Sequence, residues 1–91
     1  MNFRIIYTQG YLKRAAKFIR RHSEILPQYE KILKLLEINP SHPSLRLHRL
    51  GGPLRDLHSV SIIISYRITL ECLLEDGKIV LVNVGSHDEV Y

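Results

Sequence analysis

A period of two in the second half of the chain constrains the fold more than any other feature of the sequence. From residue 60 to residue 74, every second position carries an apolar, aromatic or cysteine side chain, and most positions between them are polar. Those positions are Val60, Ile62, Ile64, Tyr66, Ile68, Leu70, Cys72 and Leu74. Because successive side chains of a β-strand point to opposite faces, this pattern predicts strands with one buried face. A break near Ile63–Ser65 divides the stretch into two antiparallel strands.

Other strands flank this pair. Asp76-Gly77 is a strong signal for a hairpin turn. The residues after it, Lys78–Val84, are apolar on both faces, as a central strand would be. Upstream, Leu45–Leu50 and Leu54–Ile62 are strand candidates on either side of a break at residues 51–53, and Asn2–Thr8 reads as a first strand.

The segment between the first strand and residue 40 has a helical period. The apolar positions of the first predicted helix, Tyr11–His22, are Leu12, Ala15, Ala16 and Ile19. Those of the second are Tyr29, Ile32, Leu33 and Leu36. Pro27 suits the first turn of the second helix, which ends near Ile38, before Asn39-Pro40. The break at Ser23–Leu26 is short, so the two helices are expected to form an antiparallel hairpin.

These elements predict an α+β fold in one domain, residues 1–91. The expected order is an N-terminal strand, a two-helix antiparallel hairpin, and then an antiparallel sheet of three to four strands. A chain of 91 residues can form a single core but not two. Its composition, 45% hydrophobic and 24% charged, is typical of a globular protein.

The composition also indicates where the protein works. No apolar stretch approaches the roughly 20 residues of a membrane helix, and the first residues lack the apolar core of a signal peptide. Cys72 is the single cysteine, so no internal disulfide is possible and a reducing cytoplasm is the expected location. We expect no membrane partner.

Charge is distributed unevenly along the chain. Residues 1–50 carry ten Lys and Arg against three Glu, a balance of +7, and residues 51–91 carry three against six, a balance of −3, which together give the net charge of +4. A basic half suits a polyanionic partner, because cations near phosphates release counterions on binding. A solvated basic helix face is the alternative explanation.

The last eight residues hold the groups best suited to chemistry. His87, Asp88, Glu89 and Tyr91 follow a strand and a glycine at the end of the chain. Three histidines near strands, His48, His58 and His87, have no spacing typical of a metal site, so neither a metal nor a cofactor is expected.

Four residues could instead assemble a metal-independent site for cleaving RNA. Such a reaction needs a base for the ribose 2′-OH, an acid for the leaving 5′-oxygen, and a cation near the phosphorus. His48 and His87 can transfer protons, Arg67 can hold a phosphate, and Tyr91 offers a phenol and a ring for stacking. Structural roles remain open for each, such as pairing of Arg67 with Glu71 or Asp88.

The sequence at this point resembles the RelE/ParE superfamily of bacterial type II toxins, and especially its YafQ-type branch. The likeness rests on His48-Arg49-Leu50-Gly51-Gly52, on Ser65-Tyr66-Arg67-Ile68, and on the tail Val84-Gly85-Ser86-His87-Asp88-Glu89-Val90-Tyr91. Element order and length match over essentially the whole chain, and the specific similarity lies in residues 45–91.

The resemblance implies a small cytoplasmic toxin that cuts mRNA on the ribosome and is silenced by a cognate antitoxin. His48 matches a histidine that contributes to catalysis, and Arg67 the arginine that steadies the scissile phosphate. His87 matches the position of the general acid, and Tyr91 the terminal aromatic that orients the RNA. Contacts with ribosomal RNA are expected from Lys13, Arg14, Lys17, Arg20, Arg21, Arg49 and Arg55.

The chain departs from the family pattern at two positions. Ser61 stands where many relatives have a basic residue or histidine, and Leu57 replaces a frequent aromatic residue. His58 could compensate only if a bulge re-aims it, because alternation from Val60 places it on the core parity. The identity of the general base is therefore undecided: His48 is one candidate, and other groups are not excluded. Two alternatives also remain: a ParE-like inhibitor of DNA gyrase without catalysis, and a degenerate toxin that only binds its antitoxin.

Overall fold

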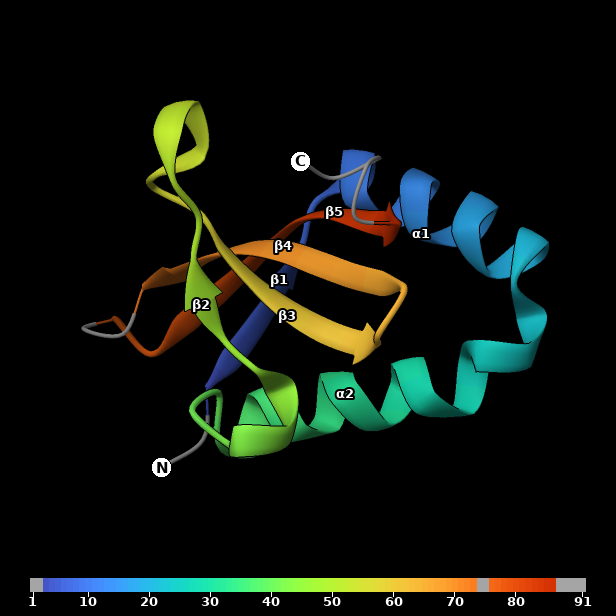
Figure 1. Cartoon of the computed structure of the whole chain (residues 1–91), viewed down its shortest axis with the longest axis horizontal. Coiled ribbons are helices and arrows are strands. Elements are labelled where there is room, and N and C mark those ends of the chain that lie inside the picture. The colour runs from blue at the N-terminus through green and yellow to red at the C-terminus, as the bar shows by residue number, and fades with distance from the viewer. Residues whose placement is uncertain (1–2, 74–75, 87–91) are drawn as a thin grey trace.

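The computed structural model describes residues 3–73 and 76–86, which have an α+β fold (Figure 1). The helices and strands are, in chain order, β1 (Arg4–Tyr7), α1 (Gln9–Arg21), α2 (Leu26–Ile38), β2 (His48–Arg49), β3 (His58–Ile63), β4 (Tyr66–Leu73) and β5 (Lys78–Ser86). Short 3₁₀ helices lie at Ser23–Ile25, Pro43–Leu45 and Gly52–Leu54. His87 and Tyr91 lie outside the described residues. The predicted order of elements is confirmed.

All five strands belong to one sheet in the order β1-β5-β4-β3-β2. Strands β2 to β5 pair antiparallel, as predicted for the residues after the helices. The N-terminal strand joins the same sheet, where β1 pairs in parallel with β5, from Arg4 beside Lys78 to Tyr7 beside Leu81. The sheet is therefore mixed and has one strand more than the three to four that were expected.

Residues at the ends of the two helices have side chains that favour those ends. The Thr8 hydroxyl accepts a hydrogen bond from the Tyr11 backbone N–H at 3.1 Å and so caps α1. Arg20 and Arg21 lie in the last turn of α1, where cations complement the helix dipole. Pro27 lies in the first turn of α2. Figure 1 shows the two helices running in opposite directions, which agrees with the predicted hairpin.

The core lies between the helices and one face of the sheet. Helix α1 packs along β5, and α2 packs against β3 and β1. The buried residues of this core include Tyr11, Ala15, Phe18, Tyr29, Ile32, Leu36, Val60, Ile62, Ile68, Leu70, Ile79, Leu81 and Val84. Among the described residues, no helix is long and apolar enough to cross a membrane.

Two of the predicted strands are shorter than expected. Only His48–Arg49 of the predicted Leu45–Leu50 is a strand, because Pro43–Leu45 forms a 3₁₀ turn and Arg46 adopts a left-handed conformation with φ 51°. The predicted strand at Leu54–Ile62 begins only at His58, since a second 3₁₀ turn, with Pro53 at its start, occupies Gly52–Leu54. The fixed φ of proline, about −65°, suits the start of such a turn, and Pro43 and Pro53 each occupy one of the first two positions of theirs.

A bulge in β5 changes which of its side chains face the core. Thr69 pairs with Asn83, but Leu70 pairs with Leu81, so Val82 is the extra residue. Before the bulge, Leu81 faces the core; after it, Val84 does. Asn83 and Gly85 are thereby moved to the opposite face, as expected for a residue inserted into a strand of period two.

Candidate functional site

The sheet face that points away from the helices is polar in the region of the predicted site. Strand register pairs His48 with Ser59, Ser59 with Thr69, Ser61 with Arg67, and Arg67 with Gly85. Side chains of directly paired residues lie on the same face of a sheet. Register therefore places His48 and Arg67, two of the four predicted catalytic residues, on one face with the buried Ser59, Ser61 and Thr69.

Arg67 is the central cation of this face. The residue is half-buried, and its Nη1 atom is buried without a hydrogen-bond partner among the described residues. A buried donor without a partner destabilises a fold by about 1–3 kcal/mol, and more when it is charged. Nothing beyond Cα projects from Gly85 on the neighbouring strand, so no β5 side chain covers the guanidinium from that position. Such an arrangement suits a planar cation that receives a phosphate.

His48 is held in a defined tautomer by the backbone. The side chain is exposed, and its Nδ1 lies 3.2 Å from the Arg46 carbonyl oxygen. A carbonyl oxygen only accepts, so the bond requires Nδ1 to carry a proton and donate it. In the neutral ring, Nε2 then has the free lone pair. His48 is therefore prepared to accept a proton at Nε2.

His58 does not share this face. It pairs with Arg49 and with Leu70, and the one irregularity of β3 lies between Ser61 and Ile63, so no bulge re-aims it. The ring is half-buried, with Nδ1 buried and without a partner among the described residues. Burial, and then the nearby charges of Arg49 and His48, lower the pKa of His58 below its usual 6.5. His58 is therefore neutral at pH 7.

Arg49 and Arg55, both predicted to contact ribosomal RNA, are joined by a hydrogen bond within a loop. Arg49 Nε donates a hydrogen bond to the Arg55 carbonyl oxygen at 2.6 Å. Both side chains are exposed. The bond joins β2 to the turn that follows it, so Arg49 has a structural role in addition to the predicted contact with RNA.

The basic residues of α1 are exposed, as expected for a helix with one polar face: Lys13, Arg14, Lys17, Arg20 and Arg21. Three of them, Arg14, Lys17 and Arg21, also line a pocket of about 220 Å³ between α1 and β5. Arg14 Nη1 donates to the Val82 carbonyl oxygen at 3.2 Å, which fixes the guanidinium against β5.

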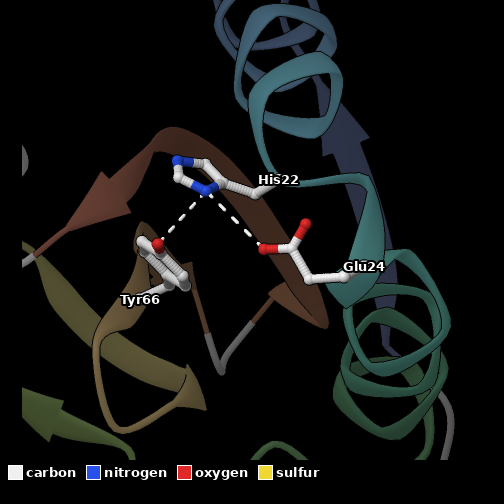
Figure 2. A network of polar contacts seen from close by, with 3 residues as sticks. All are labelled: His22, Glu24 and Tyr66. Atoms are coloured by element: carbon white, nitrogen blue, oxygen red, sulfur yellow. Dashed lines mark hydrogen bonds and ion pairs between the residues drawn. The ribbon is translucent and has the colours of Figure 1, made fainter.

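His22 has more contacts than the end of a helix would suggest. Figure 2 shows its Nδ1 directed at the Tyr66 hydroxyl, 3.1 Å away, and at Glu24 Oε1, 3.8 Å away. Its ring also packs on the rings of Phe18 and Tyr66, with centroids 4.9 and 4.6 Å apart. The sequence showed only a histidine at a helix end. The signal that could have been used is Tyr66 itself, an aromatic on the core parity directly before Arg67.

No group of three or more His, Cys, Asp or Glu side chains within residues 3–73 and 76–86 is arranged to hold a metal ion. Among the described residues, His48 and Arg67 thus share one sheet face, on β2 and β4 with β3 between them. The α1 cations Arg14, Lys17 and Arg21 lie with His22 at the helix–sheet pocket. Arg67 on β4 and the α1 cations lie on elements that contact β5, whose end leads into the tail residues His87 and Tyr91. His48 lies farther away, on β2, which pairs with β3.

Solved structures of bacterial toxins share this architecture. YafQ from E. coli superposes with a TM-score of 0.80 at 13% sequence identity, covering 98% of each chain. The E. coli DinJ-YafQ toxin-antitoxin complex matches with a TM-score of 0.78 at 15% identity, over 100% of this chain and 99% of that one. A YoeB/ParE toxin from Agrobacterium tumefaciens matches with a TM-score of 0.72 at 10% identity, over 93% and 99%.

Comparison of sequences does not assign the chain to a family. The chain matches no model of a protein family, and no curated protein is significantly similar to it in sequence. At identities this low, the structural likeness establishes the fold. The resemblance seen in the sequence is confirmed at that level: the chain has the fold of the YafQ and YoeB/ParE toxins.

Proposed function

We propose that the protein is the toxin of a type II toxin–antitoxin system and acts as a metal-independent endoribonuclease that cuts mRNA on the ribosome. The observation that carries the proposal is Arg67, a half-buried guanidinium whose Nη1 has no partner among the described residues and which lies opposite a glycine. A phosphate of the mRNA would pair with this half-buried cation.

The chemistry then needs a base and an acid on either side of that phosphate. His48 Nε2 accepts the proton of the ribose 2′-OH, and the 2′-oxygen attacks the phosphorus. His87 donates a proton to the leaving 5′-oxygen as its bond to phosphorus breaks. Arg67 offsets the charge that develops on the phosphate oxygens, and Tyr91 orients the RNA by stacking. The products are a 2′,3′-cyclic phosphate and a 5′-hydroxyl end.

The partners follow from the same proposal. The basic face of α1, with Arg49 and Arg55, binds ribosomal RNA phosphates. A cognate antitoxin holds the toxin silent in the cytoplasm, and the fold's appearance in a DinJ-YafQ toxin-antitoxin complex supports such a partner.

The test adds the purified protein to translating ribosomes and maps cuts in the mRNA, together with the chemistry of the new ends. Cuts that leave 5′-hydroxyl ends are expected, and Arg67→Gln should abolish them. Arg4→Gln makes the same change on β1 of the same sheet, away from the site, and is the matched control.

Expression of the protein in bacterial cells, with DNA cleavage and mRNA loss measured in the same culture, tests the gyrase alternative. An inhibitor of gyrase would produce gyrase-dependent DNA cleavage and leave mRNA intact. A silent toxin would do neither, and growth would be unaffected by Arg67→Gln. Either result would overturn the proposed function.

A further inference from the structure

Among residues 3–73 and 76–86, no strand lies beside the second half of β5 on the β1 side. The β1–β5 pairing ends where Tyr7 meets Leu81, and the chain then turns into α1. Two side chains bind backbone groups beyond that point. Arg14 Nη1 donates to the Val82 carbonyl oxygen at 3.2 Å, and Asn83 Oδ1 accepts from the Val84 backbone N–H at 2.9 Å. Helix α1 therefore lies along this part of β5, where its Arg14 binds one backbone carbonyl.

A pocket of about 220 Å³ lies along the same part of β5. Its lining residues are Arg14, Lys17, Phe18, Arg21, His22, Asn83 and Val84. Phe18 and Val84 are buried and supply an apolar wall, whereas the three cations are exposed. None of these described lining residues is acidic, so together they carry a formal charge of about +3 before His22 is counted.

The cationic lining of this pocket favours binding of an anion. The cavity is smaller than the roughly 300 Å³ and upward of sites for drug-sized ligands, so it suits a single compact group. Arginine at two of the lining positions favours an oxyanion that accepts paired N–H donors, as phosphate does.

A neighbouring hollow indicates that the anion is part of a polymer. Lys17, Arg20 and Arg21 line a second depression of about 370 Å³, and two of these residues also line the first. The two depressions are therefore adjacent, and both are lined by cations. Phosphates spaced along a nucleic-acid backbone match such a series of cationic sites, whereas a lone small anion would need only one.

We propose that the α1–β5 pocket binds one backbone phosphate of single-stranded RNA, with the next phosphate over the Lys17–Arg21 hollow. This inference rests on the proposed function for its choice of RNA. It goes beyond a generally basic helix face, because it assigns the contact to a shaped pocket that includes His22 and Asn83. Lys13, on the same helix, lines neither depression.

The test measures binding apart from catalysis. A short 2′-O-methyl oligouridylate lacks the nucleophile for cleavage, so its affinity can be followed by fluorescence anisotropy at several salt concentrations. For single strands, the slope of log K against log salt changes by about 0.7 for each phosphate contact. We expect Arg14→Gln to weaken binding about tenfold and to reduce the slope by about 0.7.

Two further variants keep the result interpretable. Lys17→Gln removes a lining cation that has no role in binding the Val82 carbonyl, and it should weaken binding similarly even if loss of the Arg14 bond disturbs the fold. Lys31→Gln removes the same charge from α2, outside both depressions, and should leave affinity and slope nearly unchanged. In nuclear magnetic resonance spectra, the oligonucleotide should shift the signals of His22 and Asn83.

Three outcomes would contradict the proposal that the α1–β5 pocket binds an RNA phosphate. Equal weakening by Lys31→Gln would show a diffuse charge effect, and unchanged binding by both Arg14→Gln and Lys17→Gln would exclude the pocket. Equal competition by polyglutamate would assign it to a protein carboxylate. If RNA binds in the pocket but mRNA on the ribosome is never cut, the proposed ribonuclease function is wrong and the proposed phosphate site is supported. If mRNA is cut while the pocket variants bind RNA normally, only the proposed phosphate site is wrong.

Discussion

Arg67 on β4 lies directly opposite Gly85 on β5, and this pairing exists because of the bulge at Val82. Without the extra residue, the alternation that places Ile79 and Leu81 in the core would also turn residue 85 toward the helices. With it, Gly85 shares the face of Arg67 but adds no side chain to it. The guanidinium thus stands beside a gap in the row of side chains.

Filling that gap should block the site. Paired residues in an antiparallel sheet have Cβ atoms about 4.5–5.5 Å apart, so a leucine at position 85 would contact the Arg67 side chain. Gly85→Leu is expected to abolish mRNA cutting in the ribosome assay, and Gly85→Ala to reduce it less. Positive φ angles among the described glycines occur at Gly52 and Gly77, so the backbone at Gly85 accepts either residue. Full activity of Gly85→Leu with an unchanged unfolding midpoint would contradict the inference that a phosphate reaches Arg67 past Gly85.

We expect the Arg67 guanidinium to lower the free energy of unfolding while it supports cleavage. Its Nη1 is buried without a partner in the described part of the chain, which costs about 1–3 kcal/mol in folding free energy. Arg67→Met keeps much of the side-chain volume and removes the unsatisfied donors. The free energy of unfolding in urea should stay level or rise, while cleavage falls by about a hundredfold or more. A large loss of stability would instead show that Arg67 is a structural residue.

His48 is expected to act through its imidazole and not through packing, since the side chain is exposed. Loss of a general base typically lowers a rate by about 10²–10⁴. His48→Ala should therefore cut mRNA far more slowly, with an unchanged melting temperature. Because the site of the missing ring is open to solvent, added imidazole should restore part of the rate. Failure of imidazole to restore any activity, beside a wild-type control that tolerates it, would argue against proton transfer by His48.

The order of elements was predictable because each carries its own local signal. Alternation from Val60 marks β3 and β4, Asp76-Gly77 marks the hairpin, and the apolar spacing marks both helices. The parallel pairing of β1 with β5 was not predictable, since no local pattern tells a terminal strand which partner to take. The bulge at Val82 was also hidden, because a run of valine and leucine reads as apolar on both faces whether or not one residue is inserted.

The site was predictable only in part. His48 and Arg67 were predicted from their strand positions and from the family resemblance. Register places both on one face, and their catalytic roles remain predictions. The pocket residues His22 and Asn83 were missed, because the pocket depends on where α1 lies against β5 and not on any sequence motif. Roles for His87 and Tyr91 remain predictions, as they lie outside the described residues.

His58 should make the fold sensitive to acid. Burial and nearby positive charge lower its folded-state pKa below 6.5, while in the unfolded chain it returns to that value. As pH falls below about 6.5, the unfolded state binds a proton that the folded state resists, so stability decreases until pH reaches the folded-state pKa. Urea unfolding at about pH 7.5 and about pH 5 should show a larger loss for wild type than for His58→Gln. Equal losses would mean that other groups cause the acid sensitivity.

The buried pair Tyr11 and Tyr29 should show strong coupling between α1 and α2. Their hydroxyls lie 2.7 Å apart, and burial raises the pKa of both phenols, so both stay neutral and one donates to the other. Either single change to phenylalanine leaves a buried hydroxyl without its partner and should cost about 1–3 kcal/mol in the free energy of unfolding. The double variant removes both hydroxyls and should lose clearly less than the sum of the two singles. Additive losses in urea unfolding would show that the hydroxyls contribute independently and that the bond does not join the helices.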